Sequence, residues 1–554
     1  MHPEKVDCLD FSTAHREVCG IDQVDLSGSE CKTPGRRPCP GCSQLRDIDS
    51  RINEMEIALK KLQDERCRIK TLRNKFHDAL ATALPIELLS RIFIFCLEDH
   101  SVPTKCQKGL NVHSPPLRKR SRPSGYVLGA VCKRWREIAH STPHLWTTVV
   151  VRLKDGEVDQ CAQFTRDWLS HTGSLPLTLD IYQPEGTQTS FGPPPAFDVS
   201  PIFAALNAHS SQWETVVADI HSDLMLLLRG DGNGAPRLRT LDIAAINKHL
   251  PQHYPTPPIV FSLAGPTPRP TRVKLHQIRY PSATVTWDSI THLDIWEASV
   301  AECYAILQSG MNLVECYIEK IEIANFEAPA PPQQFVLPHL QVLHIRWNDA
   351  QEVLLNALTL PSLASLFTNG PLRALPALIT RSGCKSTLTE LILSDLDTTV
   401  FDLMCALENA PLLKQLSVSG LPLDDTLFDR LSTTAFFHPA QAHADAQGVF
   451  LPHLASLSLF SDPGLFSFRA VASIFMPERE LWQEGWKRRS LSRFWLEVGD
   501  SDGGYEPLEW YMLDPWPVDS YAFALLRAVK ASGVDLRIYD GQGLDLFEYK
   551  EGDE

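Results

Sequence analysis

The feature that most constrains the fold is an apolar pattern that recurs through the middle of the chain. The pattern is Leu-x-x-Leu-x-Ile/Leu, with occasional Ile, Val or Cys at an apolar position. Its members are Leu238-Leu241-Ile243, Ile290-Leu293-Ile295, Leu313-Cys316-Ile318, Leu340-Leu343-Ile345, Leu388-Leu391-Leu393, Leu413-Leu416-Val418 and Leu454-Leu457-Leu459, with a weaker pair at Leu363 and Leu366. Between Leu293 and Leu416 successive members lie about 23 to 27 residues apart. This period predicts stacked units, each contributing one strand and one returning helix.

The segments between these triplets support the same prediction. Residues 301–308 and 401–407 carry apolar side chains at helical spacing, so each is expected to form the returning helix of its unit. The array resembles an irregular leucine-rich-repeat solenoid, because it lacks the regular buried Asn position and has a long gap before Leu454. We therefore expect an α/β solenoid over residues 152–540, with parallel strands on one face and helices on the other. Such a solenoid offers a concave strand surface to a protein partner.

Charge and composition exclude several other classes. A formal net charge of −15 argues against a general nucleic-acid binder, which needs a basic face. The longest apolar run, residues 92–97, is far shorter than the roughly 20 residues of a membrane span. The start of the chain lacks the basic and apolar blocks of a signal peptide, and 14 cysteines are too sparse for a disulfide scaffold. A protein of the cytoplasm or nucleus is expected.

The N-terminal part is predicted to contain one long helix. Residues 1–43 lack periodicity and are expected to form a flexible tail. In residues 44–82 a seam at alternating steps of four and three is formed by Ile48, Ile52, Met55, Leu59, Leu62, Arg66, Ile69, Arg73 and Phe76. The seam fits either a coiled coil that joins two copies of the chain or a single helix folded back on the neighbouring module.

A small helical module is predicted over residues 83–151. Leu84-Pro85 marks a break, and a strongly apolar helix is expected over residues 86–97. Residues 99–125 form an insertion rich in Pro, Lys and Arg, where no regular structure is expected. Helical spacing resumes over residues 127–139, and a turn then leads into a β-branched run at 147–151.

This module resembles the F-box, in particular the F-box-like proteins of mushroom-forming fungi. The resemblance lies in Leu84-Pro85-Ile86-Glu87-Leu88-Leu89, in Val131-Cys132-Lys133-Arg134-Trp135 and in Pro143-His144-Leu145-Trp146, and the long basic insertion departs from the family. It implies a Skp-type adaptor as partner and, through it, a cullin. The residues that the resemblance assigns to adaptor binding are Leu84, Pro85, Leu88, Leu89, Ile92, Phe93, Leu97, Leu128, Val131, Cys132 and Trp135.

The motifs that would indicate metal binding, phosphate binding or catalysis are incomplete in this sequence. Cys39 and Cys42 have half of a zinc-site spacing without a second pair, so no metal or cofactor is expected. The loops at 230–234 and 499–504 lack the partners of a phosphate cradle or a catalytic triad, so no enzyme is predicted. The basic cluster at 118–122 fits a solvated loop better than a nuclear-import signal, and residues 541–554 read as an acidic tail.

Two functions remain from the sequence. The first is a non-catalytic substrate receptor of a Skp/cullin/F-box ubiquitin ligase, in which the F-box-like module binds the adaptor and the repeats bind a protein substrate. The alternative is a leucine-rich-repeat scaffold with a vestigial F-box that dimerises through residues 44–80. Nothing in the repeats identifies the substrate, because surface residues that bind a partner leave no motif.

Overall fold

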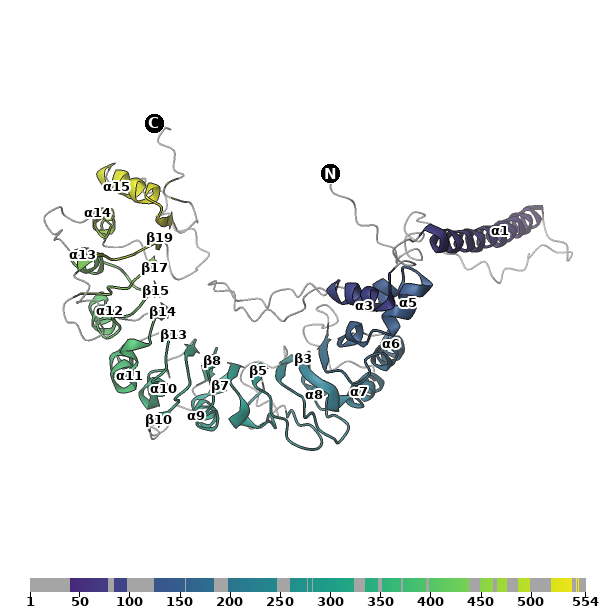
Figure 1. Ribbon diagram of the computed structural model, residues 1–554, viewed down its shortest axis with the longest axis horizontal. Helices are drawn as coiled ribbons and strands as arrows, with labels where there is room; N and C mark the ends of the chain where they lie inside the picture. The colour runs from purple at the N-terminus through teal and green to yellow at the C-terminus, as the bar shows by residue number, and fades with distance from the viewer. Residues whose placement is uncertain are drawn as a thin grey trace. The chain divides into compact units, whose positions relative to one another are not determined.

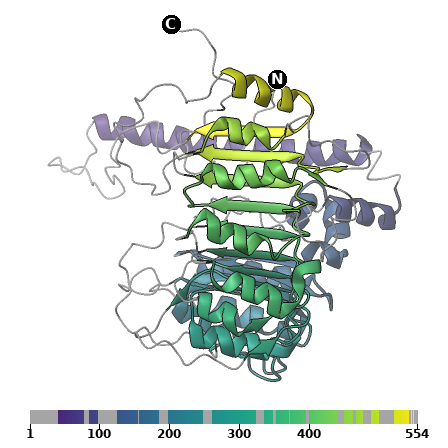
Figure 2. The ribbon, with the colours of Figure 1, turned by 90° about the vertical axis from the view of Figure 1, so that its left-hand side faces the viewer.

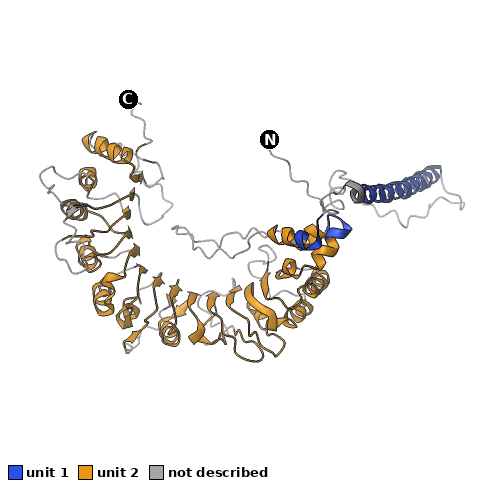
Figure 3. Cartoon of the chain, viewed as in Figure 1, with its two compact units in different colours: residues 1–89, 130–135 blue, residues 90–129, 136–554 orange. Residues whose placement is uncertain are grey.

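The computed structural model describes 18 stretches of the chain. These are residues 40–77, 84–96, 124–154, 156–183, 198–246, 260–276, 278–280, 282–322, 334–346, 351–369, 372–394, 398–437, 449–461, 466–475, 487–498, 520–540, 545 and 547. The chain divides into two compact units (Figure 3). Unit 1 comprises residues 1–89 and 130–135, and unit 2 comprises residues 90–129 and 136–554.

Unit 2 is built on one parallel sheet of 14 strands whose order follows the chain. The strands are β1 (Thr148–Arg152), β2 (Leu177–Tyr182), β3 (Trp213–His221), β4 (Thr240–Ile246), β5 (Arg272–His276), β6 (His292–Trp296), β8 (Glu315–Ile318), β11 (Val342–Ile345), β13 (Ser365–Asn369), β14 (Glu390–Ser394), β15 (Gln415–Ser419), β17 (Ser456–Ser461), β19 (Arg493–Val498) and β20 (Asp535–Asp540). Figure 2 shows them stacked in parallel. The predicted α/β class with parallel strands is confirmed.

Helices connect the strands and lie on one side of the sheet. They are α6 (Val158–Ser170), α7 (Ser200–Asn207), α8 (Ser222–Met225), α9 (Val300–Ser309), α10 (Gln351–Ala357), α11 (Ala374–Ser382), α12 (Val400–Leu407), α13 (Asp425–Thr433), α14 (Phe468–Ser473) and α15 (Ser520–Ala531). Within unit 2 the sheet curves, with the strands along its inner side and these helices along its outer side (Figure 1). We call the inner side the strand face.

Short elements complete the connections. Two-residue strands pair as β7 (Ala298–Ser299) with β9 (Ile321–Glu322), β10 (Phe335–Val336) with β12 (Leu358–Thr359), and β16 (Phe436–Phe437) with β18 (Lys487–Arg488). Single 3₁₀ turns are η1 (Pro143–Trp146), η2 (Ser210–Gln212), η3 (Trp287–Ser289) and η4 (Cys384–Ser386). The glycine-rich loop at 230–234 leads toward β4 and opens no helix, as the sequence predicted.

The core lies between the sheet and the helices. Every apolar residue of the recurring pattern is buried there, from Leu238 to Leu459. Strand register brings the second position of each unit into line, so that Leu293 pairs with Cys316, Cys316 with Leu343, and Leu366 with Leu391. Alternate residues of a strand point to opposite faces, so the same residues leave their neighbours on the strand face.

Local sequence explains where several helices begin. Ser299 caps α9 in a capping box, accepting a hydrogen bond from the backbone N–H of Glu302 while the Glu302 carboxylate accepts from the N–H of Ser299. Thr399 and Asp402 make the same exchange at α12. These caps satisfy N–H groups that have no partner inside the helix, and so they fix the first turn of each returning helix.

A buried arginine holds the long connection before β17. Arg489 is 5% exposed, and its guanidinium donates hydrogen bonds to the backbone oxygens of Leu431, Thr434, Phe450 and Leu451 and to the Thr434 hydroxyl. These oxygens come from the end of α13 and from the segment that precedes β17. The side chain therefore satisfies backbone acceptors that the enlarged unit would otherwise leave in an apolar interior.

The N-terminal helices are α1 (Pro40–His77), α3 (Ile86–Phe95), α4 (Ser124–Gly129) and α5 (Lys133–His140). α1 begins inside the segment expected to be a tail. The single helix predicted over residues 127–139 is instead two helices, because the chain turns between Gly129 and Lys133. Cys132 Sγ accepts a hydrogen bond from the backbone N–H of Trp135 at 3.4 Å, as a capping side chain does, and so starts α5.

Candidate protein-binding surfaces

Helix α3 has one exposed and one buried apolar face. Leu88, Ile92 and Phe95 follow the i, i+4, i+7 spacing of one helix face, and they are 47%, 43% and 86% exposed. Leu89 and Phe93 lie on the other face and are 2% and 0% exposed. Three large apolar side chains therefore lie exposed in a row on this short helix, which makes it a candidate interaction surface.

The other residues predicted for adaptor binding fall into different environments. Pro85 and Val131 are exposed, whereas the half-buried ones are Leu84, Leu128, Cys132 and Trp135. Leu97 lies outside the described residues. Leu89 and Phe93, which the sequence also assigns to adaptor binding, are buried within the chain. Phe95, which the sequence analysis did not select, is more exposed than either neighbour on its face.

Hydrogen bonds from arginine side chains to backbone oxygens hold these segments in place within each unit. In unit 1 the Arg134 guanidinium donates to the carbonyl oxygen of Leu84 at 3.0 Å, which joins the two blocks that carry the F-box resemblance. In unit 2 the Arg136 Nε donates to the carbonyl oxygen of Gly129 at 3.0 Å and satisfies an acceptor at the end of α4. These two hydrogen bonds hold the first turn of α5 against the backbone of neighbouring segments.

An aromatic cluster anchors the end of the helical module within unit 2. Trp146 Nε1 donates to the carbonyl oxygen of Ala139, and Trp168 Nε1 donates to that of Trp146, both at 2.7 Å. The ring of Tyr126 lies 5.1 Å from those of Trp146 and Trp168. Burial raises the pKa of Tyr126. The buried Trp of the Pro-His-Leu-Trp block therefore joins α4, α5 and α6 just before the first strand.

The strand face carries a row of aromatic and charged side chains near its centre. Strand register aligns Lys274, Asp294, Tyr317, His344, Phe367 and Ile392 across six neighbouring strands. The Tyr317 and His344 rings are 4.5 Å apart, and those of His344 and Phe367 are 5.4 Å apart. Lys274 Nζ lies 2.9 Å from an oxygen of Asp294. The row therefore changes from charged at β5 and β6 to aromatic and apolar at β8 to β14.

A second row follows one pleat further along the strands. It contains His276 and Trp296, whose rings are 5.1 Å apart, and the ion pair of Arg346 with Glu319 at 3.7 Å. The Arg346 guanidinium lies 5.3 Å from the centre of the Phe367 ring, within the range of a cation–π contact. Aromatic rings and a guanidinium are the side chains that most often dominate protein interfaces, so this part of the strand face is the second candidate surface.

The ionisable groups of the strand face are tuned by partial burial. Burial lowers the pKa of His276, and the neighbouring Lys274 acts in the same direction. Burial and Arg272 likewise lower the pKa of His292. Burial raises the pKa of Glu319, while Arg346 opposes that rise. These shifts follow from packing between neighbouring strands.

Two of the buried cysteines, Cys303 and Cys384, are held in the thiol form by their surroundings. Burial raises the pKa of the Cys303 thiol to about 12 and that of Cys384 to about 11, so both remain thiols at neutral pH. Among the described residues no group of three His, Cys, Asp or Glu side chains could hold a metal ion. The side chains of Cys39 and Cys42, the basic cluster at 118–122 and the 499–504 loop lie outside them.

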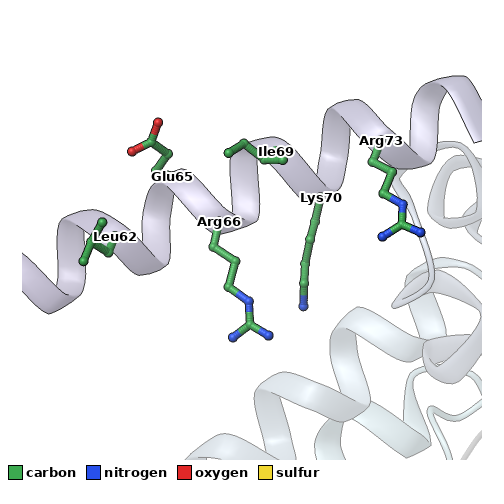
Figure 4. Close-up of a pocket in the computed structure, with 6 residues that line it drawn as sticks. All are labelled: Leu62, Glu65, Arg66, Ile69, Lys70 and Arg73. Atoms are coloured by element: carbon green, nitrogen blue, oxygen red, sulfur yellow. The ribbon is translucent and has the colours of Figure 1, made fainter.

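Helix α1 is a third exposed surface. All of its side chains from residue 43 to 73 are exposed, including those of the apolar seam. Figure 4 shows six side chains that project from this helix and line a shallow pocket, namely Leu62, Glu65, Arg66, Ile69, Lys70 and Arg73. Among the described residues no helix is both long enough and apolar enough to span a membrane.

Comparison with known proteins assigns this chain to no family. The sequence matches none of the protein-family models and none of the curated proteins with which it was compared.

Proposed function

We propose that this chain is the substrate-recognition subunit of a Skp/cullin/F-box-type ubiquitin ligase. The observation that carries the proposal is the exposed apolar face of α3, formed by Leu88, Ile92 and Phe95, in the segment that resembles an F-box. A partner that receives this face in an apolar groove would remove all three side chains from water. A Skp-type adaptor is the partner that the F-box resemblance implies.

The strand face supports the other half of the proposal. A parallel sheet with helices on one side resembles a leucine-rich-repeat solenoid, and such proteins bind partners on their concave strand surface. The half-buried rings of Tyr317 and His344, with Arg346 beside the buried Phe367, offer the anchors that a protein substrate would contact. The protein would act by proximity, because it raises the effective concentration of the substrate near a ubiquitin-charged enzyme.

Adaptor binding is the direct test. The full chain is co-expressed with a Skp-type adaptor, and the affinity of the purified proteins is measured by calorimetry. We expect Leu88→Asp and Ile92→Asp each to weaken the complex by about 30-fold or more, which corresponds to a hot spot of about 2 kcal/mol. Phe401→Asp, at an exposed apolar residue of α12, is the matched control and should leave the affinity unchanged. Wild-type affinity of the folded Leu88→Asp variant would remove the assigned contact.

A second candidate function is favoured by α1. A scaffold with a vestigial F-box would dimerise through the α1 seam without binding the adaptor, and the exposure of Leu59 and Leu62 fits such a role. Sizing with and without adaptor separates the two functions. A dimer that needs Leu59 and Leu62 and does not bind the adaptor would favour the scaffold.

A further inference from the structure

The seam of α1 has the form of a coiled-coil interface. The helix is 38 residues long, and its seam positions alternate as a and d of a heptad. The a positions are Leu45, Ile52, Leu59, Arg66 and Arg73, and the d positions are Ile48, Met55, Leu62, Ile69 and Phe76. All of these from Leu45 to Arg73 are exposed. A solvent-exposed α-helix with such a seam has little stability as a single helix, because helix propensity contributes little without packing.

The two halves of α1 carry opposite charge. Residues 43–58 hold four acidic and two basic side chains, whereas residues 59–75 hold seven basic and two acidic ones. In a parallel pair of helices the basic half of one helix would lie beside the basic half of the other helix, and the two halves would repel each other. In an antiparallel pair each basic half lies beside the acidic half of the other copy. Charge therefore favours the antiparallel arrangement of two identical helices.

The two arginines of the seam distinguish the orientations further. A parallel pair sets each a position against the same residue of the other helix, so Arg66 and Arg73 would each face their own copy. An antiparallel pair sets a against d. With Leu59 opposite Leu62 of the partner subunit, Arg66 falls opposite Met55 of the partner subunit and Arg73 opposite Ile48 of the partner subunit. Met55 is flanked in the sequence by Glu54 and Glu56, and Ile48 by Asp47 and Asp49, so this arrangement brings each arginine near carboxylates and away from its own copy.

We propose that α1 binds a second copy of this chain as an antiparallel coiled coil centred between Leu59 and Leu62. In this register g positions face g positions and e positions face e positions. Arg51 lies beside Glu65 of the partner subunit, and Glu56 lies beside Lys70 of the partner subunit. Twofold symmetry repeats each pair, so four opposite-charge contacts flank the apolar layers. The inference rests on α1 alone and does not depend on adaptor binding.

The first experiment measures association of the full chain. Sedimentation equilibrium should give a dimer, and Leu59→Asp with Leu62→Asp should give a monomer, because the central layers would then hold carboxylates. Ile57→Asp is the matched control, since Ile57 is 49% exposed on the same helix but lies outside the seam, and it should leave the dimer intact. A monomeric wild-type chain at micromolar concentration, or equal loss with Ile57→Asp, would overturn the proposal.

The second experiment determines orientation by disulfide formation. Ile52→Cys and Ile69→Cys are prepared separately in full chains that also carry Cys67→Ser, and are oxidised alone or as a mixture. In the proposed register residue 52 faces residue 69 of the partner subunit, so only the mixture forms the 52–69 bond, which peptide mass mapping identifies. A covalent dimer through 69–69 in Ile69→Cys alone would show a parallel coil and refute the proposed orientation.

Charge exchange gives a readout that a general loss of helix would not produce. Glu56→Lys should weaken the dimer several-fold, because it faces Lys70 of the partner subunit in both symmetric copies. Adding Lys70→Glu should restore the wild-type dissociation constant. In a parallel coil Glu56 would face Arg51 of the partner subunit, so restoration by Arg51→Glu, and not by Lys70→Glu, would contradict the antiparallel register.

Discussion

Strand β14 offers a sharp test of which residues form the core and which form the binding face. Leu391 is fully buried on the helix side, and its neighbour Ile392 is half-buried on the strand face. Leu391→Ala removes three carbon atoms from a close-packed site and should cost about 3 kcal/mol. Ile392→Ala removes side-chain atoms that are partly in water and should cost about 1 kcal/mol or less.

Hydrogen exchange is the suitable assay, because a long stack of units need not unfold in one cooperative step. For amides of β13 to β15 that exchange through opening of these strands, about 3 kcal/mol corresponds to a rate increase of roughly 150-fold in Leu391→Ala. Ile392→Ala should increase the same rates by roughly fivefold. Equal effects of the two substitutions, or a larger one from Ile392→Ala, would refute the assignment of the two faces.

Two further outcomes concern polar side chains that packing removes wholly or partly from water. Arg489→Met should destabilise unit 2 by about 3 kcal/mol or more, because it leaves the backbone oxygens of Leu431, Phe450 and Leu451 without their donor. Denaturant melts measure this loss, and Arg493→Met, which changes an exposed side chain, is the control that should not show it. An equal loss in the two variants would contradict the role of Arg489. Burial lowers the pKa of His276, so its contribution to stability is present above its ordinary pKa of about 6.5 and is lost as pH falls toward the lowered value. Thermal melts from pH 7.5 to 5 should therefore show a smaller acid-induced loss in His276→Phe than in the wild type, and an unchanged loss would count against this cause.

The sequence predicted the repeating part of the fold well where leucine marks the strand. Leu293, Leu343 and Leu391 stand at equivalent buried positions, and a fixed period follows from the fixed geometry of strand, turn and returning helix. The pattern did not reveal β3 or β19, where Val216 and Phe494 take the same place after long connections. Any apolar side chain of suitable size fills such a site, so a search for leucine alone misses it.

The candidate surfaces were less predictable than the core. The α3 segment was expected to be helical, but it is apolar almost all round, so the sequence could not separate the buried Phe93 from the exposed Phe95. Tyr317 and His344 occupy variable positions of the repeat, which no packing rule restricts. Their proximity depends on strand register, and register becomes visible only once the strands are paired.

The interruption between α4 and α5 illustrates a different limit. Residues 127–139 have helical spacing throughout, yet the helix ends at Gly129 and a new one starts at Lys133. The Cys132 sulfur acts as the cap, a role that is usual for Ser, Thr, Asp or Asn. A capping signal based on those four residues does not detect it.

The central claim is that the exposed face of α3 binds a Skp-type adaptor. The most direct measurement is the dissociation constant of the full chain for that adaptor, compared among the wild type, Ile92→Asp and the control Phe401→Asp. We expect a specific complex whose affinity falls by about 30-fold or more in Ile92→Asp and stays constant in Phe401→Asp. No measurable complex with the wild-type chain, or one that tolerates Ile92→Asp, would contradict it.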